Sequence, residues 1–329
     1  MSAGGFAAAS LALVFNAFVW GLSWWPFRLL DERGLHPLWA SCLISALCAL
    51  AVLAAHRGVP QLPAEHRGGL LALGLACGAT NAAFNWGITI GEVVRVVLLF
   101  YLMPVWSLLA ARFLLHEPIH PRGILQMLLA LIGALLVLWK PDPLAQPSGG
   151  PVGGPDMVDV GHFAGIDWLR DPADWLGLIG GVAFALTNVL LRRHREAPSA
   201  SRAMAMFAGG ALVPAVIALQ PLHAVADVPT LSWHWGAPLL ALALAFLAAN
   251  LALQSGAARL PARLTALIML SELVFAVGSA VWIGDETLRM ITVLGASMIL
   301  AATLWGLVDV QGRPSSSFPQ PDADPPSRA

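Results

Sequence analysis

Residues 81–117, "NAAFNWGITIGEVVRVVLLFYLMPVWSLLAARFLLHE", align without a gap onto residues 250–286, "NLALQSGAARLPARLTALIMLSELVFAVGSAVWIGDE", at a constant offset of 169. Few positions are identical, but the matches fall on polar residues, which are scarce in this chain. Weak self-similarity of this kind is how internal structural repeats show in membrane transporter sequences. The aligned pairs are Asn81 with Asn250, Asn85 with Gln254, Gly87 with Gly256 and Glu117 with Glu286.

The composition places the whole chain in a membrane. Of 329 residues, 58% are hydrophobic and 11% are charged, whereas roughly 25% of the residues in a soluble domain are charged. The three cysteines, Cys42, Cys48 and Cys77, all lie in apolar runs and are typical of small buried hydrophobic residues. We therefore expect an integral membrane protein without a disulfide framework.

Ten apolar stretches are long enough to span a bilayer, the first over residues 7–30 and the last over 289–308. They divide the chain into a first five-helix repeat (1–140), a Gly/Pro-rich acidic linker (141–172), a second five-helix repeat (173–308) and a polar, proline-rich tail (309–329) that we expect to be disordered. Because five is odd, the second half enters the membrane upside down relative to the first. The expected fold is all-α, with ten transmembrane helices in two inverted repeats.

The distribution of positive charge predicts the orientation. With the N-terminus inside, 12 of the 18 Lys and Arg residues fall on the inner side and 6 on the outer side, as the positive-inside rule requires. Both termini are therefore expected in the cytoplasm, and the acidic linker outside.

One short motif points to a different function. Residues His116 to His120 spell H-E-x-x-H, the pattern of many zinc peptidases, which places both imidazoles on one helix face. Pro118 lies between the two histidines and breaks such a helix. The repeat counterpart, residues 284–288, keeps the glutamate and lacks both histidines. We therefore expect neither a metal site nor an enzyme.

Two segments carry a resemblance to a known family. These are "LMPVWSLLAARFLLHEP" (102–118), followed by "GALLVL", and "SELVFAVGSAVWIGDETL" (271–288), followed by "GASMIL". In these segments the chain resembles the ten-span EamA-type members of the drug/metabolite transporter superfamily, and among them the branch that exports aromatic amino acids. The second copy has Leu273 where the first has Pro104. The resemblance implies a carrier for small metabolites.

Polar groups in the middle of the spans are the first candidates for a substrate cavity, because such groups usually face the bundle interior. Asn81 and Asn85 share one helix face, as do Asn250 and Gln254. Interhelical hydrogen bonds that only hold the bundle together are the alternative. Glu272 is the only carboxylate near the middle of a span; it either binds substrate or a proton, or is a protonated structural group.

The other candidates are aromatic, hydroxyl or amide side chains at similar depth. A flat ligand would stack on aromatic faces, although Trp near a span end is more often an interfacial anchor. Pro104 is expected to break its span and act as a hinge, and Arg95 is a weaker candidate that could attract a carboxylate at the outer mouth. The remaining predicted substrate-binding residues are Trp20, Trp24, Tyr101, Asn188 and Ser271.

The sequence thus predicts a transporter of the bacterial inner membrane that exports aromatic or other apolar amino acids by alternating access. Another amino acid, a nucleobase or a cationic drug is the alternative substrate, and an intramembrane enzyme or a receptor is the alternative class. The expected partners are a small molecule and the lipid bilayer. No cofactor and no nucleic acid are expected, and the oligomeric state stays open.

Overall fold

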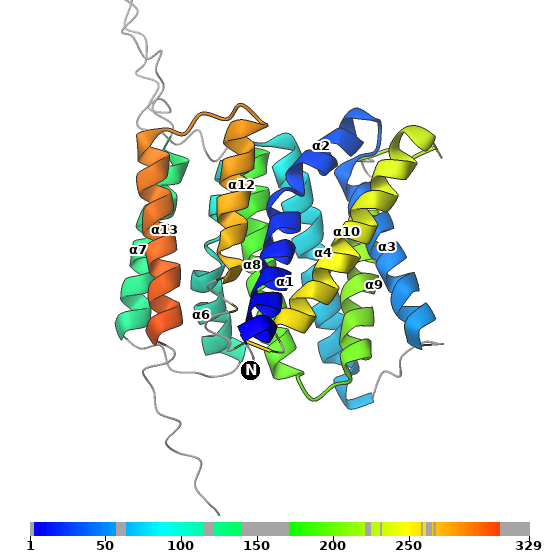
Figure 1. Cartoon of the computed structure of the whole chain (residues 1–329), viewed down its shortest axis with the longest axis horizontal. Helices are drawn as coiled ribbons and strands as arrows, with labels where there is room; N and C mark the ends of the chain where they lie inside the picture. Colours follow the sequence, from blue (N-terminus) through cyan, green and yellow to red (C-terminus); the bar gives the residue numbers. More distant parts are fainter. Residues whose placement is uncertain are drawn as a thin grey trace, which may run out of the picture.

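The structure is a computed structural model that describes residues 3–56, 64–114, 121–139, 171–220, 225–230, 232–257, 259–260, 265 and 268–309. Within these ranges every regular element is a helix (Figure 1). The zinc-like pattern at 116–120, most of the linker and the tail from residue 310 lie outside the described residues.

The helices of the first half are α1 (Ala3–Gly21), α2 (Trp24–Glu32), α3 (Pro37–His56), a 3-10 turn η1 (Ala64–His66), α4 (Arg67–Ile90), α5 (Val93–Phe100), α6 (Met103–Leu114) and α7 (Pro121–Leu138). Those of the second half are α8 (Pro172–Arg193), α9 (Ser199–Ala218), α10 (Trp233–Ala257), α12 (Ser271–Trp282) and α13 (Met290–Asp309).

Most of these helices are built to cross a membrane. Six stretches are long and apolar enough for a span, counting α1 with α2 and α5 with α6, and α7, α12 and α13 are shorter apolar helices. α4 has 24 residues and is therefore also long enough to cross a bilayer. The protein is therefore an all-α integral membrane protein, as the composition predicts.

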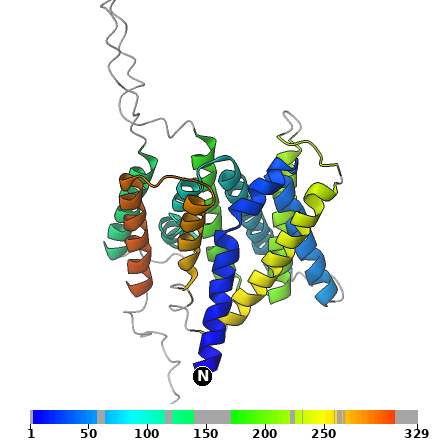
Figure 2. The same ribbon diagram turned by 45° about the horizontal axis from the view of Figure 1, so that its top comes forward.

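The two halves run in opposite directions. α1 starts at the N-terminal end of the bundle, whereas α8 starts at the far end and returns to α9 at the N-terminal end (Figure 1). Packing follows the repeat. In the repeat, α1 corresponds to α8, α4 to α10 and α6 to α12. α4 and α6 of the first half both pack on α8, and α10 and α12 of the second half both pack on α1. The other two corresponding pairs, α3 with α9 and α7 with α13, pack directly on each other. The pair of α7 and α13 forms one edge of the molecule (Figure 2).

Glycines let some of these helices touch backbone to backbone, as small residues do in membrane bundles. A Cβ added at Gly209 of α9 would lie 1.8 Å from the carbonyl oxygen of Gly74 on α4. A Cβ at Gly295 of α13 would lie 2.5 Å from the carbonyl oxygen of Gly133 on α7. Only glycine permits either contact.

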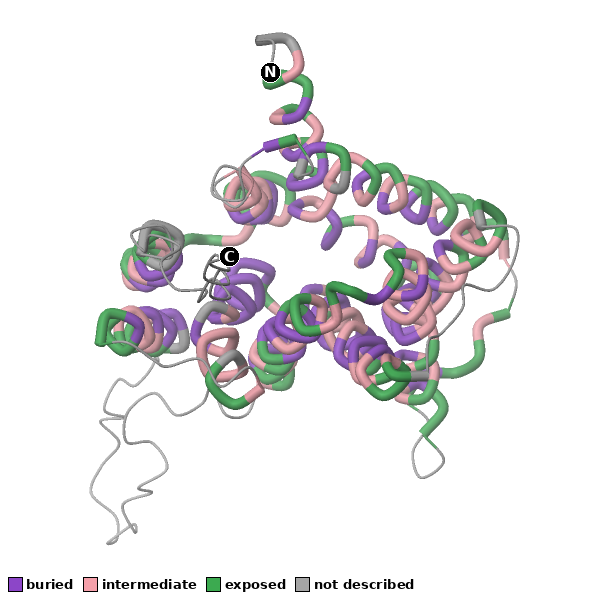
Figure 3. The backbone as a smooth tube through the Cα atoms, turned by 90° about the horizontal axis from the view of Figure 1, so that it is seen from below, coloured by how far each residue is buried: buried purple, intermediate pink, exposed green. Residues whose placement is uncertain are grey.

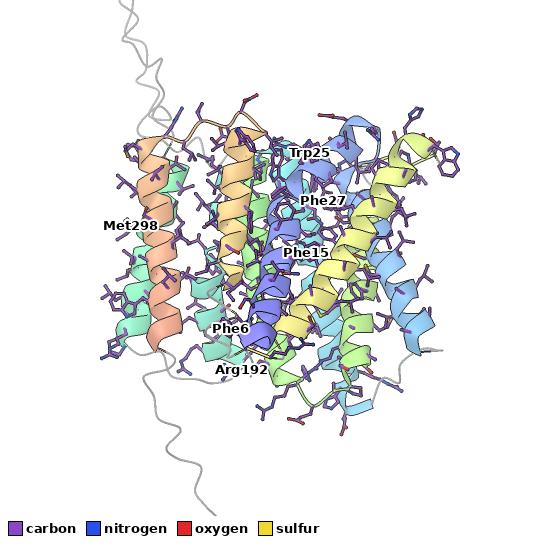
Figure 4. The ribbon with its side chains drawn as sticks, viewed as in Figure 1. Phe6, Phe15, Trp25, Phe27, Arg192 and Met298 are labelled. Atoms are coloured by element: carbon purple, nitrogen blue, oxygen red, sulfur yellow. The ribbon has the colours of Figure 1, made fainter. Side chains whose placement is uncertain are left out.

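Large apolar side chains cover much of the outer surface. On α1, Phe6 and Phe15 are exposed and point away from the bundle (Figure 4). The buried residues lie on the inner faces of the helices (Figure 3). Such a surface is stable only in lipid, where exposed apolar groups are not in contact with water.

Candidate functional site

Three helical passes are interrupted near the same place. α1 ends at Gly21 and α2 starts at Trp24, α5 ends at Phe100 and α6 starts at Met103, and α12 starts directly after the turn residue Leu270. At the repeat offset of 169, the interruption at Tyr101 falls on Leu270. The break is therefore shared by the two halves, and broken helices of this kind form substrate sites in many transporters.

The causes of the breaks differ. Pro104 is the second residue of α6, a position where its missing N–H is not needed. Its counterpart Leu273 lies in the first turn of α12, so the second break forms without a proline. Between α1 and α2, the Trp20 carbonyl accepts hydrogen bonds from both the hydroxyl and the backbone N–H of Ser23, at 2.7 and 3.1 Å.

A pocket lies between the two halves at these breaks. Its walls come from the α1–α2 break, α4, α5 and α12, so neither half forms it alone. Its volume is about 10 Å³, about the room of a single water molecule and far below the roughly 300–1,000 Å³ typical of drug-sized ligand sites. The lining residues are Trp20, Gly21, Ser23, Trp24, Phe84, Ile88, Val93, Val97, Glu272 and Ala276.

Glu272 is the charged residue of this lining. Its side chain is half-buried in the first turn of α12, and no hydrogen bond or ion pair reaches it from the described part of the chain. The phenol of Tyr101, which is buried at the α5–α6 break, lies within electrostatic range of the carboxyl group. A carboxyl group without a partner in a mainly apolar pocket can take up a proton or a cationic ligand.

Trp20 and Trp24 form the aromatic side of the pocket. The Trp20 ring stacks on Phe246 of α10 at 4.4 Å between centroids. The Trp24 indole N–H donates a 2.8 Å hydrogen bond to Ser279 of α12, and the Arg28 guanidinium lies 5.0 Å from the centre of the Trp24 ring. Both rings are thus fixed by the protein, which presents rigid aromatic faces to the pocket.

The two asparagines of α4 make contacts away from the pocket lining. The Asn85 amide donates a 2.9 Å hydrogen bond to the Ser41 hydroxyl of α3, and it is buried. The Asn81 amide donates to the Cys77 carbonyl one turn earlier and lies near Gly210 of α9. The Asn85 bond joins two helices, whereas the Asn81 bond stays within α4. A role of either side chain in substrate binding stays a prediction.

The other predicted site residues are also outside the lining set. Asn188 is exposed on α8, Asn250 is half-buried on α10, and the Ser271 hydroxyl donates to the Ile268 carbonyl at 2.6 Å. The side chains of Gln254 and Pro104 lie outside what the structure describes. Their roles in binding, and the hinge role of Pro104, stay predictions.

Arg95 has a structural role rather than one at an open mouth. It is buried, and its guanidinium donates to both carboxylate oxygens of Asp174 on α8 and to the Val137 carbonyl of α7. The guanidinium is thus already bound to protein groups and is not free to attract a carboxylate. This ion pair could not be predicted from sequence patterns, because its two residues are 79 positions apart.

The apolar part of the lining could not be read from the sequence. Phe84, Val97 and Ala276 resemble dozens of other apolar residues in this chain, and only the packing of α4, α5 and α12 brings them together. Among the described residues no group of three His, Cys, Asp or Glu side chains is placed to hold a metal ion.

The fold and the pocket define the class: an integral membrane protein of two repeat halves with a pocket between them at broken helices. The EamA-like transporter family matches residues 7–139 and 171–307. The chain belongs to this family, and it is therefore a membrane transporter of small molecules.

The comparison with solved structures shows the same fold. One crystal structure, described only as that of a protein, has 16% sequence identity and a TM-score of 0.53, and the match covers 93% of this chain and 98% of that chain. At this identity the likeness shows the fold alone. No curated protein matches the chain.

Proposed function

We propose that the protein exports amino acids, mainly aromatic or other apolar ones, by alternating access around the pocket between its halves. The single observation that carries the proposal is the pairing of Glu272 with fixed aromatic walls at the level of the broken helices. The family match supports transport of a small molecule, and the chemistry of the pocket supports the kind of molecule.

The carboxyl group suits the amino group of the substrate. An ammonium ion beside Glu272 would supply the missing ionic partner and recover part of the cost of placing a charge in an apolar site. The Trp20 and Trp24 rings can contact an apolar side chain and attract the ammonium through their faces. A substrate with one ammonium group and one flat apolar group matches both features.

A second candidate substrate is a cation without a carboxylate. The described lining contains Glu272 but no Lys or Arg. A substrate carboxylate would therefore depend on backbone N–H groups, such as those at the start of α12 next to Glu272 in the sequence. An alkylamine that carries an aromatic ring has no carboxylate and would need no partner for one. This observation favours cationic compounds as the alternative to amino acids.

We place the protein in a bacterial inner membrane, and the positive-inside count supports an orientation with both termini in the cytoplasm. With this orientation, export moves substrate from the end of the bundle that holds the N-terminus to the far end, where α2 and the 283–289 loop lie (Figure 1).

Uptake into proteoliposomes separates the two candidates. Tryptophan carries both charged groups, tryptamine lacks the carboxylate, and indole-3-propionate lacks the amine. An amino acid carrier takes up tryptophan in preference to both analogues, whereas a cation carrier prefers tryptamine. In either case the acid without an amine is excluded.

The matched variants are Glu272→Gln and Glu92→Gln. Glu92 has a side chain that is 62% exposed and outside the pocket lining. Glu272→Gln should lower uptake of the amine-bearing substrate by about tenfold or more, the effect of losing a charge-assisted contact, and Glu92→Gln should leave it unchanged. Normal flux in Glu272→Gln, or failure of the wild-type protein to move any of the three compounds, would refute the proposal.

A further inference from the structure

Above the pocket, at the end of the bundle far from the N-terminus, Glu286 joins the two halves. Its two carboxylate oxygens accept hydrogen bonds from the backbone N–H groups of Val93 (2.7 Å) and Val94 (3.0 Å) at the start of α5. The residue before α5, Glu92, makes no capping hydrogen bond with its own side chain. A glutamate of the second half therefore caps a helix of the first half, where a negative charge is favoured by the helix dipole.

Arg28 of α2 completes this cluster. Its guanidinium donates to the carbonyls of Ile88 (3.2 Å) and Gly91 (2.6 Å) at the end of α4 and lies 3.5 Å from Glu286. Both side chains are largely buried, with 27% and 13% exposed. The cluster thus ties α2, the α4–α5 turn and the turn after α12 to one another.

The cluster is stacked directly on the pocket. Arg28 lies over the Trp24 ring, and Trp24 and Val93 both line the pocket below. A Cβ at Gly284 would lie 3.2 Å from the Trp24 ring, so the turn after α12 also rests on this indole. The path from the pocket to this end of the bundle therefore passes through Trp24, Arg28 and Glu286.

The backbone after α12 holds Glu286 in place. Asp285 has a φ of 52°, in the left-handed region, which Asp and Asn adopt more readily than other residues with a side chain. The Glu286 N–H then donates to the Ala280 carbonyl at 3.1 Å. This tight turn directs the carboxylate toward α5.

We infer that Glu286 and Arg28 are the gate that closes the pocket toward the end of the bundle far from the N-terminus. The inference rests on the proposed function, since a gate has meaning only in a carrier with alternating access. Opening this end requires α2 and α12 to move away from the α4–α5 turn, and that movement breaks the cap and the ion pair together. Removing the Glu286 charge therefore shifts the equilibrium toward the state open at this end.

The test measures access to the pocket from each side of the membrane. Cys42, Cys48 and Cys77 are replaced by alanine, and Ala276→Cys places one thiol in the pocket lining. The protein is reconstituted in proteoliposomes of known orientation, and a membrane-impermeant thiosulfonate is added to one side. The rate of thiol modification from the far end reports how often the gate is open.

Glu286→Gln should raise the far-end rate by about tenfold, the change in an equilibrium when one charge-assisted hydrogen bond is lost. Arg28→Gln should raise it in the same direction, because the cluster loses its cation and two bonds to α4. The matched control is Asp285→Asn, which removes a neighbouring exposed charge and keeps a residue that tolerates left-handed φ. This variant should leave the far-end rate at the parental value.

Glu286→Asp provides a second variant that keeps the charge but shortens its reach, and it should give a smaller rise than glutamine. Folding is followed by size-exclusion elution and by modification from the N-terminal side. An unchanged far-end rate in Glu286→Gln, or an equal rise in Asp285→Asn, would overturn the inference. The labelling needs no substrate, so a carrier that fails every uptake assay but shows the rise would lose the proposed function and keep the gate.

Discussion

The buried ion pair between Arg95 and Asp174 allows a quantitative prediction. Arg95 is 5% exposed and Asp174 is 2% exposed, and the pair links α5 to α8, with Val137 of α7 as a third partner. Replacing Asp174 with leucine leaves a buried guanidinium with the Val137 carbonyl and, at 4.0 Å, the largely exposed carboxylate of Glu92. Loss of one partner of a buried pair costs about 3–5 kcal/mol in the free energy of unfolding.

The double variant Arg95→Met/Asp174→Leu should recover most of this loss. It removes both charges, and well-packed apolar residues in place of a buried ion pair are often neutral or stabilising. The two single variants and the double variant form a double-mutant cycle, in which a large coupling energy reports that the charges act as a pair.

Titration of the detergent-solubilised protein with sodium dodecyl sulfate, followed by tryptophan fluorescence, gives the free energy of unfolding, since the chain has 13 Trp. The control is Glu196→Gln, which breaks the Arg195–Glu196 pair, where each side chain is 77% exposed; such pairs contribute little. The reasoning fails if Asp174→Leu costs no more than Glu196→Gln, or if the double variant is as unstable as the single one.

Three further perturbations test other contacts. Gly209→Ala should separate α4 from α9 and lower the thermal midpoint in detergent, because the added methyl group would lie 1.8 Å from the Gly74 carbonyl. Gly21→Ala should reduce uptake more than it reduces stability, because its Cβ would lie 2.7 Å from the backbone of α12 beside the pocket. Burial lowers the pKa of His36 below its ordinary 6.5, and its Nδ1 accepts the Leu38 N–H at the start of α3. The stabilising contribution of His36 should therefore be present above pH 6.5 and be lost as the pH drops below it. Asparagine can cap the helix at any pH, so the thermal midpoint of His36→Asn should depend less on pH than that of the wild type.

Each of these has a matched comparison. Gly236→Ala adds a methyl group that meets nothing within 4 Å, so its thermal midpoint should equal that of the wild type. Equal losses in this variant and in Gly209→Ala would count against close packing of α4 on α9. A wild-type midpoint that rises on acidification would contradict the assignment for His36.

The sequence predicted the helices well because each long apolar run has only one stable form in lipid, where every backbone hydrogen bond must be made within the helix. The break near Pro104 was also foreseen, since proline disfavours a continuous helix. The break at Leu22–Ser23 was not predicted, although Gly21 and Pro26 flank it and Pro26 cannot donate to the Leu22 carbonyl. The start of α12 at Ser271 was not predicted either, because Leu273 stands there in place of a proline, and packing rather than propensity places it.

The candidate site was predicted less completely. Trp20, Trp24 and Glu272 were named from the sequence and meet in one pocket. Both Glu272 and Asn85 were chosen because polar residues are scarce in the spans. That criterion could not tell that Glu272 lines the pocket whereas Asn85 bonds to Ser41. Polarity inside a membrane indicates that a group needs a partner, but whether the partner is a neighbouring helix or a ligand depends on rotation about the helix axis, which residue type does not reveal.

The contact of Glu286 with α5 is made to main-chain amides, which every residue except proline carries. Substitutions at positions 93 and 94 can therefore accumulate without loosening the contact, as long as proline is avoided. Correlated changes between these positions and residue 286 would not be found among related sequences, even though the atoms touch. Searches that rely on coupled substitutions would overlook this link, and a proline scan along the start of α5 would reveal it.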